Sequence, residues 1–237
     1  MERLTFVRGV VIRRPSKQCK SPYVADVLLD DGSEIIAHAP SLGFLCEKGS
    51  VIYMTLSARP TLCTHIIHLG KQNDIIVGIH PKSAEKIVEF ALKNNLIDSL
   101  KNLKELQREK KMLNSRFDFM GIDEQGHPFI LEVKSVPLCE NNIAYFPGSH
   151  KKNACISPRA LKHIQELQHI KENYPNYRTL LCFVVQRQDA TSFRINDKDT
   201  IYNEAVKEAM LKGVECIVLQ VVWNEDGQCT FIKMLDS

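Results

Sequence analysis

Several features that would indicate particular classes of protein are missing from this chain. Its eight cysteines form no Cys-x-x-Cys pair, so the usual spacing of a zinc site is absent. No apolar run approaches the roughly 20 residues of a membrane span, and the first residues lack the pattern of a signal peptide. The net charge of +3 permits nucleic-acid binding without indicating it. We therefore expect a soluble, cytoplasmic protein from a reducing compartment.

The composition is that of an ordinary globular protein. Of the 237 residues, 44% are hydrophobic and 25% are charged, which is sufficient for a real core. A chain of this length forms one large domain or two small ones. The pattern of short strands ends near residue 78, so we expect one domain over residues 1–78 and a second over residues 79–237.

The first of these domains consists of short strand-like runs separated by Gly and Asp turns. Five such strands predict a small OB-like β-barrel, an architecture that binds single strands and oligonucleotides. The expected strands cover residues 6–13, 23–29, 34–39, 50–57 and 65–69. Arg13 ends the first run and Arg14 follows it. These two residues either contact nucleic acid or form a solvated basic edge.

Residues 114–136 have the pattern of a β-hairpin with charged residues on one face. Phe117 and Phe119 alternate with Asp118 in the first strand, and Asp123–Pro128 has the composition of a turn. The second strand is apolar except at Glu132 and Lys134, which project from the same face because they are two residues apart. Charged side chains in such a strand are costly unless they are paired or bind a ligand.

An Asp on one strand and Glu-x-Lys on the next suit a metal-dependent phosphodiesterase. Asp118 and Glu132 would hold Mg²⁺ or Mn²⁺ through carboxylate oxygens, and the cation would activate water and neutralise phosphate charge. Lys134 would orient the water or stabilise the pentacoordinate phosphate. The alternative is an exposed strand face with a weak cross-pair, but the apolar flanks and the neighbouring Asp favour a functional site.

The remainder of the chain predicts a mixed-sheet α/β domain. We expect helices at 81–94, 158–173 and 200–211, and strands at 179–185, 214–223 and 230–234. We expect residues 96–106 to form a polar connector or a second helix, and residues 139–156 to form a loop. Basic side chains near the hairpin either contact phosphates or belong to a solvated face without a binding role. These residues are Arg116, Lys151, Lys152, Arg159 and Lys162.

Several segments together resemble the sugar fermentation stimulation protein A (SfsA) family. The matching segments are Arg108-Glu109, residues 114–119, residues 132–138, Phe146-Pro147, Arg159, Lys162-His163 and residues 213–215. The resemblance covers nearly the whole chain and is strongest from residue 108 to residue 170. The chain departs from the family pattern at Ser41, Leu42 and Gly148, so its substrate or partner need not be that of typical members.

The resemblance implies an OB-like domain joined to a PD-(D/E)xK nuclease-like domain. It also implies an association with DNA binding and with regulation of sugar, notably maltose, metabolism. In such a domain Asp118 and Glu132 would be metal ligands and Lys134 the catalytic lysine, with Glu109 as a further acidic group.

Two functions are therefore open: a divalent-metal-dependent nuclease, and a non-catalytic DNA-binding regulator on a nuclease-like scaffold. DNA is the expected partner, RNA remains open, and no membrane is involved. A homodimer is suggested by analogy alone.

Overall fold

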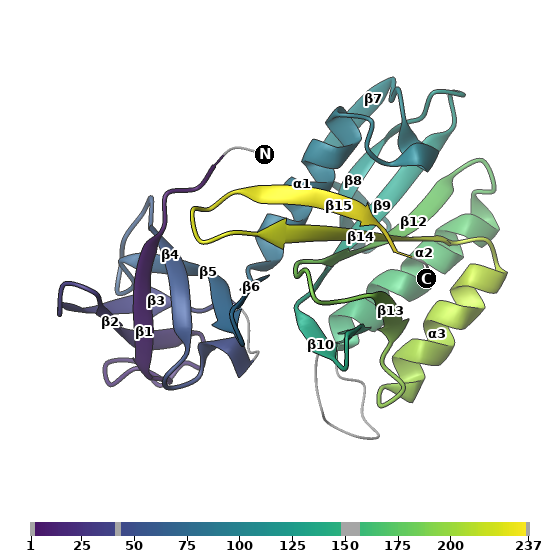
Figure 1. The fold of residues 1–237 in the computed structure, drawn as a ribbon. Coiled ribbons are helices and arrows are strands. Elements are labelled where there is room, and N and C mark those ends of the chain that lie inside the picture. The colour runs from purple at the N-terminus through teal and green to yellow at the C-terminus, as the bar shows by residue number, and fades with distance from the viewer. Residues whose placement is uncertain (1–2, 41–43, 148–156, 236–237) are drawn as a thin grey trace. The chain divides into compact units, whose positions relative to one another are not determined.

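The computed structural model describes residues 3–40, 44–147 and 157–235 (Figure 1). The chain divides into two units. The barrel unit comprises residues 1–83, 185–189 and 220–233, and the α/β unit comprises residues 84–184, 190–219 and 234–237. The barrel unit thus takes in two stretches from late in the chain, which the expected boundary after residue 78 does not include.

The barrel unit contains a closed barrel of five strands. Its sheet has the order β3-β2-β1-β4-β5-β6, and a parallel pairing between β3 and β5 closes the barrel. Closure leaves the five strands without free edges, and the interior is filled by buried side chains such as Val27, Ile52 and Ile67. The predicted OB-like barrel is confirmed. Its elements are β1 (Val7–Arg13), β2 (Val24–Leu29), β3 (Glu34–His38), η1 (Phe44–Cys46), β4 (Val51–Leu56), β5 (His65–Gln72) and β6 (Ile75–Gly78).

The turn between β14 (Glu215–Trp223) and β15 (Cys229–Met234) contacts the barrel within the same unit. The N–H of Leu4 donates to the carbonyl of Gly227 at 3.2 Å, and Lys71 of β5 pairs with Glu225 at 3.2 Å. These contacts explain why residues 220–233 belong to the barrel unit.

A six-stranded sheet with the order β15-β14-β12-β9-β8-β7 forms the centre of the second part of the fold. Helices α2 and α3 pack side by side (Figure 1), and a smaller sheet has the order β10-β11-β13. The predicted mixed-sheet α/β fold is confirmed. Its remaining elements are α1 (Pro81–Lys93), η2 (Asp98–Leu100), β7 (Glu105–Met112), β8 (Ser115–Ile122), β9 (Pro128–Val136), β10 (Leu138–Glu140), β11 (Ile143–Phe146), α2 (Pro158–Asn173), β12 (Arg178–Val185), β13 (Ser192–Ile195) and α3 (Thr200–Leu211).

Helix α2 begins where the sequence predicts. The Ser157 side chain accepts the N–H of Ala160 at 3.3 Å, and Pro158 lies in the first turn, where its missing N–H costs nothing. Ile164, Leu167 and Ile170 on one face of the helix are fully buried. The cap and the apolar face together fix how α2 lies against the sheet.

Two local predictions were wrong. Residues 105–112 form strand β7, where a connector or second helix was expected up to residue 106, and residues 138–146 form the β10–β11 hairpin, where a loop was expected. Strand β7 is mostly exposed and charged, so it shows no alternation of apolar residues. It exists because it pairs along its length with β8, from Glu105 opposite Ile122 to Met112 opposite Ser115.

Candidate active site

Strands β8 and β9 bring the predicted acidic residues together. Phe117 and Phe119 are fully buried, and Asp118, which lies between them, points to the other face and is half-buried. The Asp118 Oδ2 atom accepts the backbone N–H of Val133 at 2.8 Å. This bond ties the carboxylate of β8 to the strand that carries Glu132 and Lys134.

Glu132 is the most enclosed charged group of the cluster, with only 3% of its surface exposed. Its Oε1 atom accepts from Lys134 Nζ at 2.5 Å and from Nδ1 of His163 on α2 through a short hydrogen bond. Its Oε2 atom is buried and has no hydrogen-bond partner among the residues that the structure describes. A buried carboxylate oxygen in this state is available to accept a further hydrogen bond or to coordinate a cation.

The surroundings move the pKa values of the two carboxyl groups in opposite directions. Burial, with the added repulsion of Glu132 and Glu85, raises the pKa of Asp118 to about 7. Burial also acts to raise the pKa of Glu132, but the hydrogen bond from His163 and the charge of Lys134 outweigh it, and the net pKa is lowered. At neutral pH Glu132 is therefore ionised, whereas Asp118 is close to half protonated.

The sequence did not assign a role to two residues of this cluster, Glu85 and His163. Glu85 on α1 acts electrostatically on Asp118, and its side chain is only 12% exposed and lies 3.5 Å from Arg108. The sequence feature that could have drawn attention to Glu85 is its spacing of four residues from Glu89, which puts both acidic side chains on one face of a helix. A solvated helix face has the same pattern, so this spacing does not indicate a site. His163 belongs to the Lys162-His163 segment that resembles the family, but the sequence assigned it no role in the site.

Other predicted site residues lie elsewhere in the α/β unit. Glu109 is on β7, where its side chain is 43% exposed and lies 3.5 Å from Arg116. Its role as a further acidic group stays a prediction. Lys162 donates to the Asn114 carbonyl at 3.0 Å, and Arg159 is exposed in the first turn of α2.

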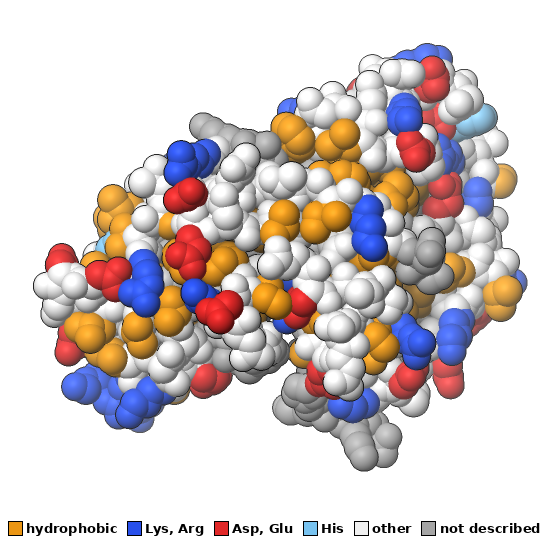
Figure 2. Space-filling view, viewed as in Figure 1, with side chains coloured by type: hydrophobic (Ala, Val, Ile, Leu, Met, Phe, Trp, Pro, Cys, Tyr) orange, Lys and Arg blue, Asp and Glu red, His pale blue; other side chains and the backbone are white. Residues whose placement is uncertain are grey.

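The basic residues do not form one continuous surface on the side shown in Figure 2. Within the α/β unit, Lys and Arg side chains alternate there with Asp and Glu side chains. Arg13 is exposed at the end of β1, and Arg14 Nε donates to the Pro22 carbonyl at 2.6 Å. Several residues named from the sequence lie outside the described ranges; they are Ser41, Leu42, Gly148, Lys151 and Lys152.

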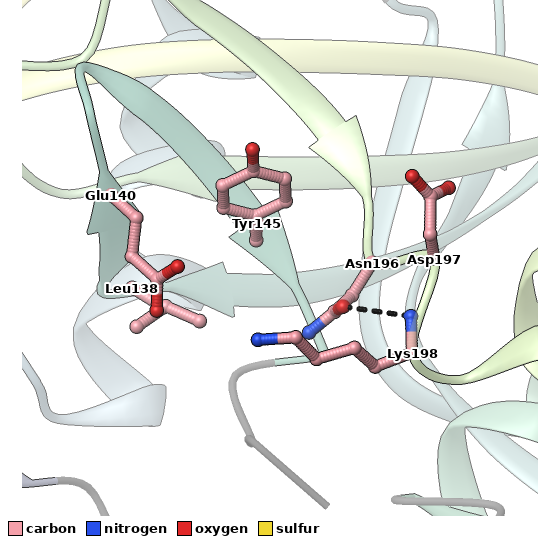
Figure 3. Close-up of a pocket in the computed structure, with 6 residues that line it drawn as sticks. All are labelled: Leu138, Glu140, Tyr145, Asn196, Asp197 and Lys198. Carbon is pink, nitrogen blue, oxygen red and sulfur yellow. Dashed lines mark hydrogen bonds between the residues drawn. The ribbon is translucent and has the colours of Figure 1, made fainter. Parts of the chain in front are cut away.

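A pocket of about 150 Å³ lies on the smaller sheet and contains no member of the carboxylate cluster (Figure 3). The carboxylates of Glu140 and Asp197 are part of its wall and would repel a phosphate group. We therefore place the candidate site at Asp118 and Glu132 rather than in this pocket. Its wall is formed by Leu138, Glu140, Tyr145, Asn196, Asp197 and Lys198.

Asp118 and Glu132 suit a hard divalent cation. Within residues 3–40, 44–147 and 157–235, no group of three or more His, Cys, Asp or Glu side chains could hold a metal ion. Mg²⁺ commonly uses only one or two carboxylates, with water and substrate phosphate as its other ligands. A cation here would satisfy Glu132 Oε2 and offset the repulsion that raises the pKa of Asp118. The residues present therefore fit a two-carboxylate site.

An Asp-bearing strand is followed by a Glu-x-Lys strand within a mixed sheet, and a closed barrel precedes both along the chain. This is the arrangement that the sequence predicted for a PD-(D/E)xK nuclease-like domain. Comparison with known proteins identifies the family. The profile described as "Sugar fermentation stimulation protein RE domain" matches residues 82–227, and the chain belongs to the sugar fermentation stimulation protein family.

Individual relatives match over most of their length. A sugar fermentation stimulation protein homolog of Clostridium perfringens is 30% identical and aligns over 97% of this chain and 94% of its own. A homolog from Shewanella sp. is 33% identical over 90% and 92%, respectively. The solved structure of Pyrococcus furiosus SfsA in complex with Ca²⁺ is 22% identical, covers 99% of this chain and 96% of its own, and has a TM-score of 0.86. That similarity shows a shared fold.

None of the helices that the structure describes is both long enough and apolar enough to cross a bilayer.

Proposed function

We propose that this protein is a cytoplasmic nucleic-acid-binding protein that hydrolyses phosphodiester bonds at a divalent-metal site. Asp118 and Glu132 hold the cation, and Lys134 is the catalytic lysine. The observation that supports the proposal most strongly is the unpartnered Oε2 atom of the buried Glu132, beside a second carboxylate and an ammonium group. A protein that only bound DNA would gain nothing from two carboxylates near phosphates, because like charges repel.

Each residue has a separate task in this proposal. A bound divalent cation would neutralise phosphate charge and lower the pKa of water. Asp118 must lose its proton before it can act as a ligand, and its raised pKa places that step near neutral pH. The ammonium group of Lys134 would stabilise the charge that develops on the phosphate. Mg²⁺ or Mn²⁺ is the proposed cation. The Pyrococcus furiosus protein was solved in complex with Ca²⁺, which also prefers oxygen ligands.

The proposed substrate is DNA, with RNA as the alternative to be tested. Arg116 is exposed and lies on the same face of β8 as Asp118, two residues away, which is about 6.7 Å along a strand. We therefore propose that Arg116 contacts a phosphate next to the one that reacts. We also propose phosphate contacts for Arg13, Arg14, Arg159 and Lys162.

A second candidate function is a non-catalytic DNA-binding regulator of sugar metabolism. The name of the family supports it, as does the ion pair that holds Lys134 Nζ 2.5 Å from Glu132 Oε1 instead of leaving it directed at a substrate. In that case a cation at Asp118 and Glu132 would stabilise the fold and no strand would be cut.

A panel of nucleic acids separates the two functions. End-labelled single- and double-stranded DNA and RNA are incubated with the protein and Mg²⁺ or Mn²⁺, with and without EDTA. Cleavage that requires the cation and stops with EDTA supports the nuclease. Binding without cleavage of any substrate, under conditions where the cation does bind, favours the regulator.

Arg116→Ala should weaken DNA binding and reduce its salt dependence. Each lost phosphate contact lowers the slope of log K against log salt by about 0.9 for duplex DNA and about 0.7 for single strands. Fluorescence anisotropy at four salt concentrations measures this slope, with EDTA present to prevent cleavage. Lys207→Ala is the control, since Lys207 is an exposed cation on α3. Equal slopes for Arg116→Ala and wild type would remove Arg116 from the interface.

A further inference from the structure

The hydrogen bond between His163 and Glu132 has no place in the PD-(D/E)xK pattern of two carboxylates and a lysine. His163 comes from α2, 31 residues further along the chain. It is 5% exposed, and its ring lies 6.0 Å from that of Phe117, the neighbour of Asp118. The Ser157 cap and the buried face of α2 fix the helix that carries it. The imidazole is thus held rigidly against the carboxylate.

The direction of this bond follows from its partners. Lys134 Nζ lies 2.5 Å from Glu132 Oε1, so the acidic group beside it is a carboxylate, which only accepts hydrogen bonds. His163 must therefore donate from Nδ1–H. That proton leaves Nδ1 no lone pair for Lys134, whose Nζ is 3.4 Å away. Both side chains are therefore donors to the same oxygen.

We infer that His163 is a positioning residue of the cation site: it holds Glu132 Oε1, directs Oε2 to the metal, and keeps the carboxylate in place when Lys134 turns to the substrate. The inference rests on the proposed function. Lys134 has to leave Glu132 if its ammonium is to reach a phosphate, because the two groups are now in direct contact. His163 is the other described donor on Oε1, so it alone would remain to orient the carboxylate.

This division of tasks predicts opposite effects for the two donors. Removing Lys134 removes a cation that competes for Glu132, so Lys134→Ala should bind Mn²⁺ as tightly as wild type or more tightly. Removing His163 frees the carboxylate to turn toward Lys134, so Mn²⁺ affinity should fall by about 10–100-fold, as is usual when the partner of a metal ligand is lost.

The test is calorimetric titration of the full-length protein with Mn²⁺ at pH 8. The variants are His163→Asn, His163→Gln, His163→Leu and Lys134→Ala. The Asn amide nitrogen is bonded to Cγ, like Nδ1, and can replace the donor; the Gln nitrogen is one bond further out, like Nε2, and cannot. We expect His163→Asn to stay within a few-fold of wild type, and His163→Gln and His163→Leu to lose about 10–100-fold.

The outcomes separate this inference from the proposed function. Absence of Mn²⁺ binding in wild type overturns both. If wild type binds Mn²⁺ and His163→Gln binds it with the same affinity, the inference alone is overturned. A lower melting temperature of His163→Gln would not rescue it, because a purely structural histidine alters only the stability. If His163→Leu does not fold, the comparison of the Asn and Gln variants decides.

Discussion

Lys134→Ala should lower metal-dependent strand cleavage by about 10²–10³-fold, the usual cost of removing one group that stabilises transition-state charge. Its ammonium acts on the phosphate as negative charge develops, so its loss affects the transition state more than the bound substrate. Mn²⁺ affinity should not fall, since Lys134 is not a ligand. The measurement is single-turnover cleavage of whichever nucleic acid the panel identifies, at saturating Mn²⁺.

Glu132→Gln should give a different result. The amide keeps the size of the side chain and one acceptor oxygen, but it loses the charge, so both Mn²⁺ binding and cleavage should fall to background. Lys207→Ala, on the exposed part of α3, is the control for general effects of losing a lysine. Full cleavage activity in Lys134→Ala would contradict the catalytic role of the lysine. Retained Mn²⁺ binding in Glu132→Gln would contradict its role as a ligand.

Asp118→Asn should make the metal-free protein more stable at pH 8 than the wild type. The folded pKa of Asp118 is about 7 and its ordinary value is 3.8, so between about pH 4 and pH 7 the folded state retains a proton that the unfolded state has lost. The free energy of unfolding therefore falls as pH rises through this window and stays low above it. The difference between variant and wild type should be small near pH 4 and largest at pH 8.

The size of this effect is on the order of a few kcal/mol, or about 10 °C in melting temperature. Asparagine can still accept the N–H of Val133, so the β8–β9 contact is kept. Thermal melts at pH 4, 5.5, 7 and 8 with EDTA measure it. Adding Mn²⁺ at pH 8 should raise the melting temperature of the wild type and leave Asp118→Asn unchanged. Equal pH profiles for the two proteins would show that burial does not perturb Asp118.

Much of the fold could be predicted because local patterns and packing agree. The Ser157-Pro158 start of α2 carries its own capping signal, and the apolar run of β12 has seven buried residues. The alternation at Phe117 and Phe119 predicted β8 for the same reason. Each of these elements leaves a local signal in the sequence, either a period of apolar residues or a continuous apolar run.

Strand β7 and the β10–β11 hairpin could not be predicted because their stability comes from partners. The exposed segment from Arg108 to Met112 has no apolar period, and it is a strand through hydrogen bonds to β8. The pairing of β11 with β13 is parallel and joins residues almost 50 positions apart, such as Ile143 and Ser192. No local sequence pattern specifies such a pairing.

The candidate site could also be predicted from the sequence only in part. Glu132 and Lys134 were predicted to share a face because they are two residues apart on one apolar strand. Asp118 was predicted to join them because it lies on the neighbouring strand of the same hairpin. His163 and Glu85 were not, because each comes from a helix whose packing against the sheet is a tertiary property. A histidine in a helix gives no sign in the sequence that its ring will meet a carboxylate 31 residues away.

The most direct test of the account is the melting temperature of the full-length wild type at pH 8, with Mn²⁺ and then with excess EDTA. A cation that binds only the folded state stabilises it by mass action. We predict a rise that increases with Mn²⁺ concentration, is reversed by EDTA and is absent from Glu132→Gln. A melting temperature that does not respond to Mn²⁺, Mg²⁺ or Ca²⁺ at millimolar concentration would contradict a cation site at Asp118 and Glu132.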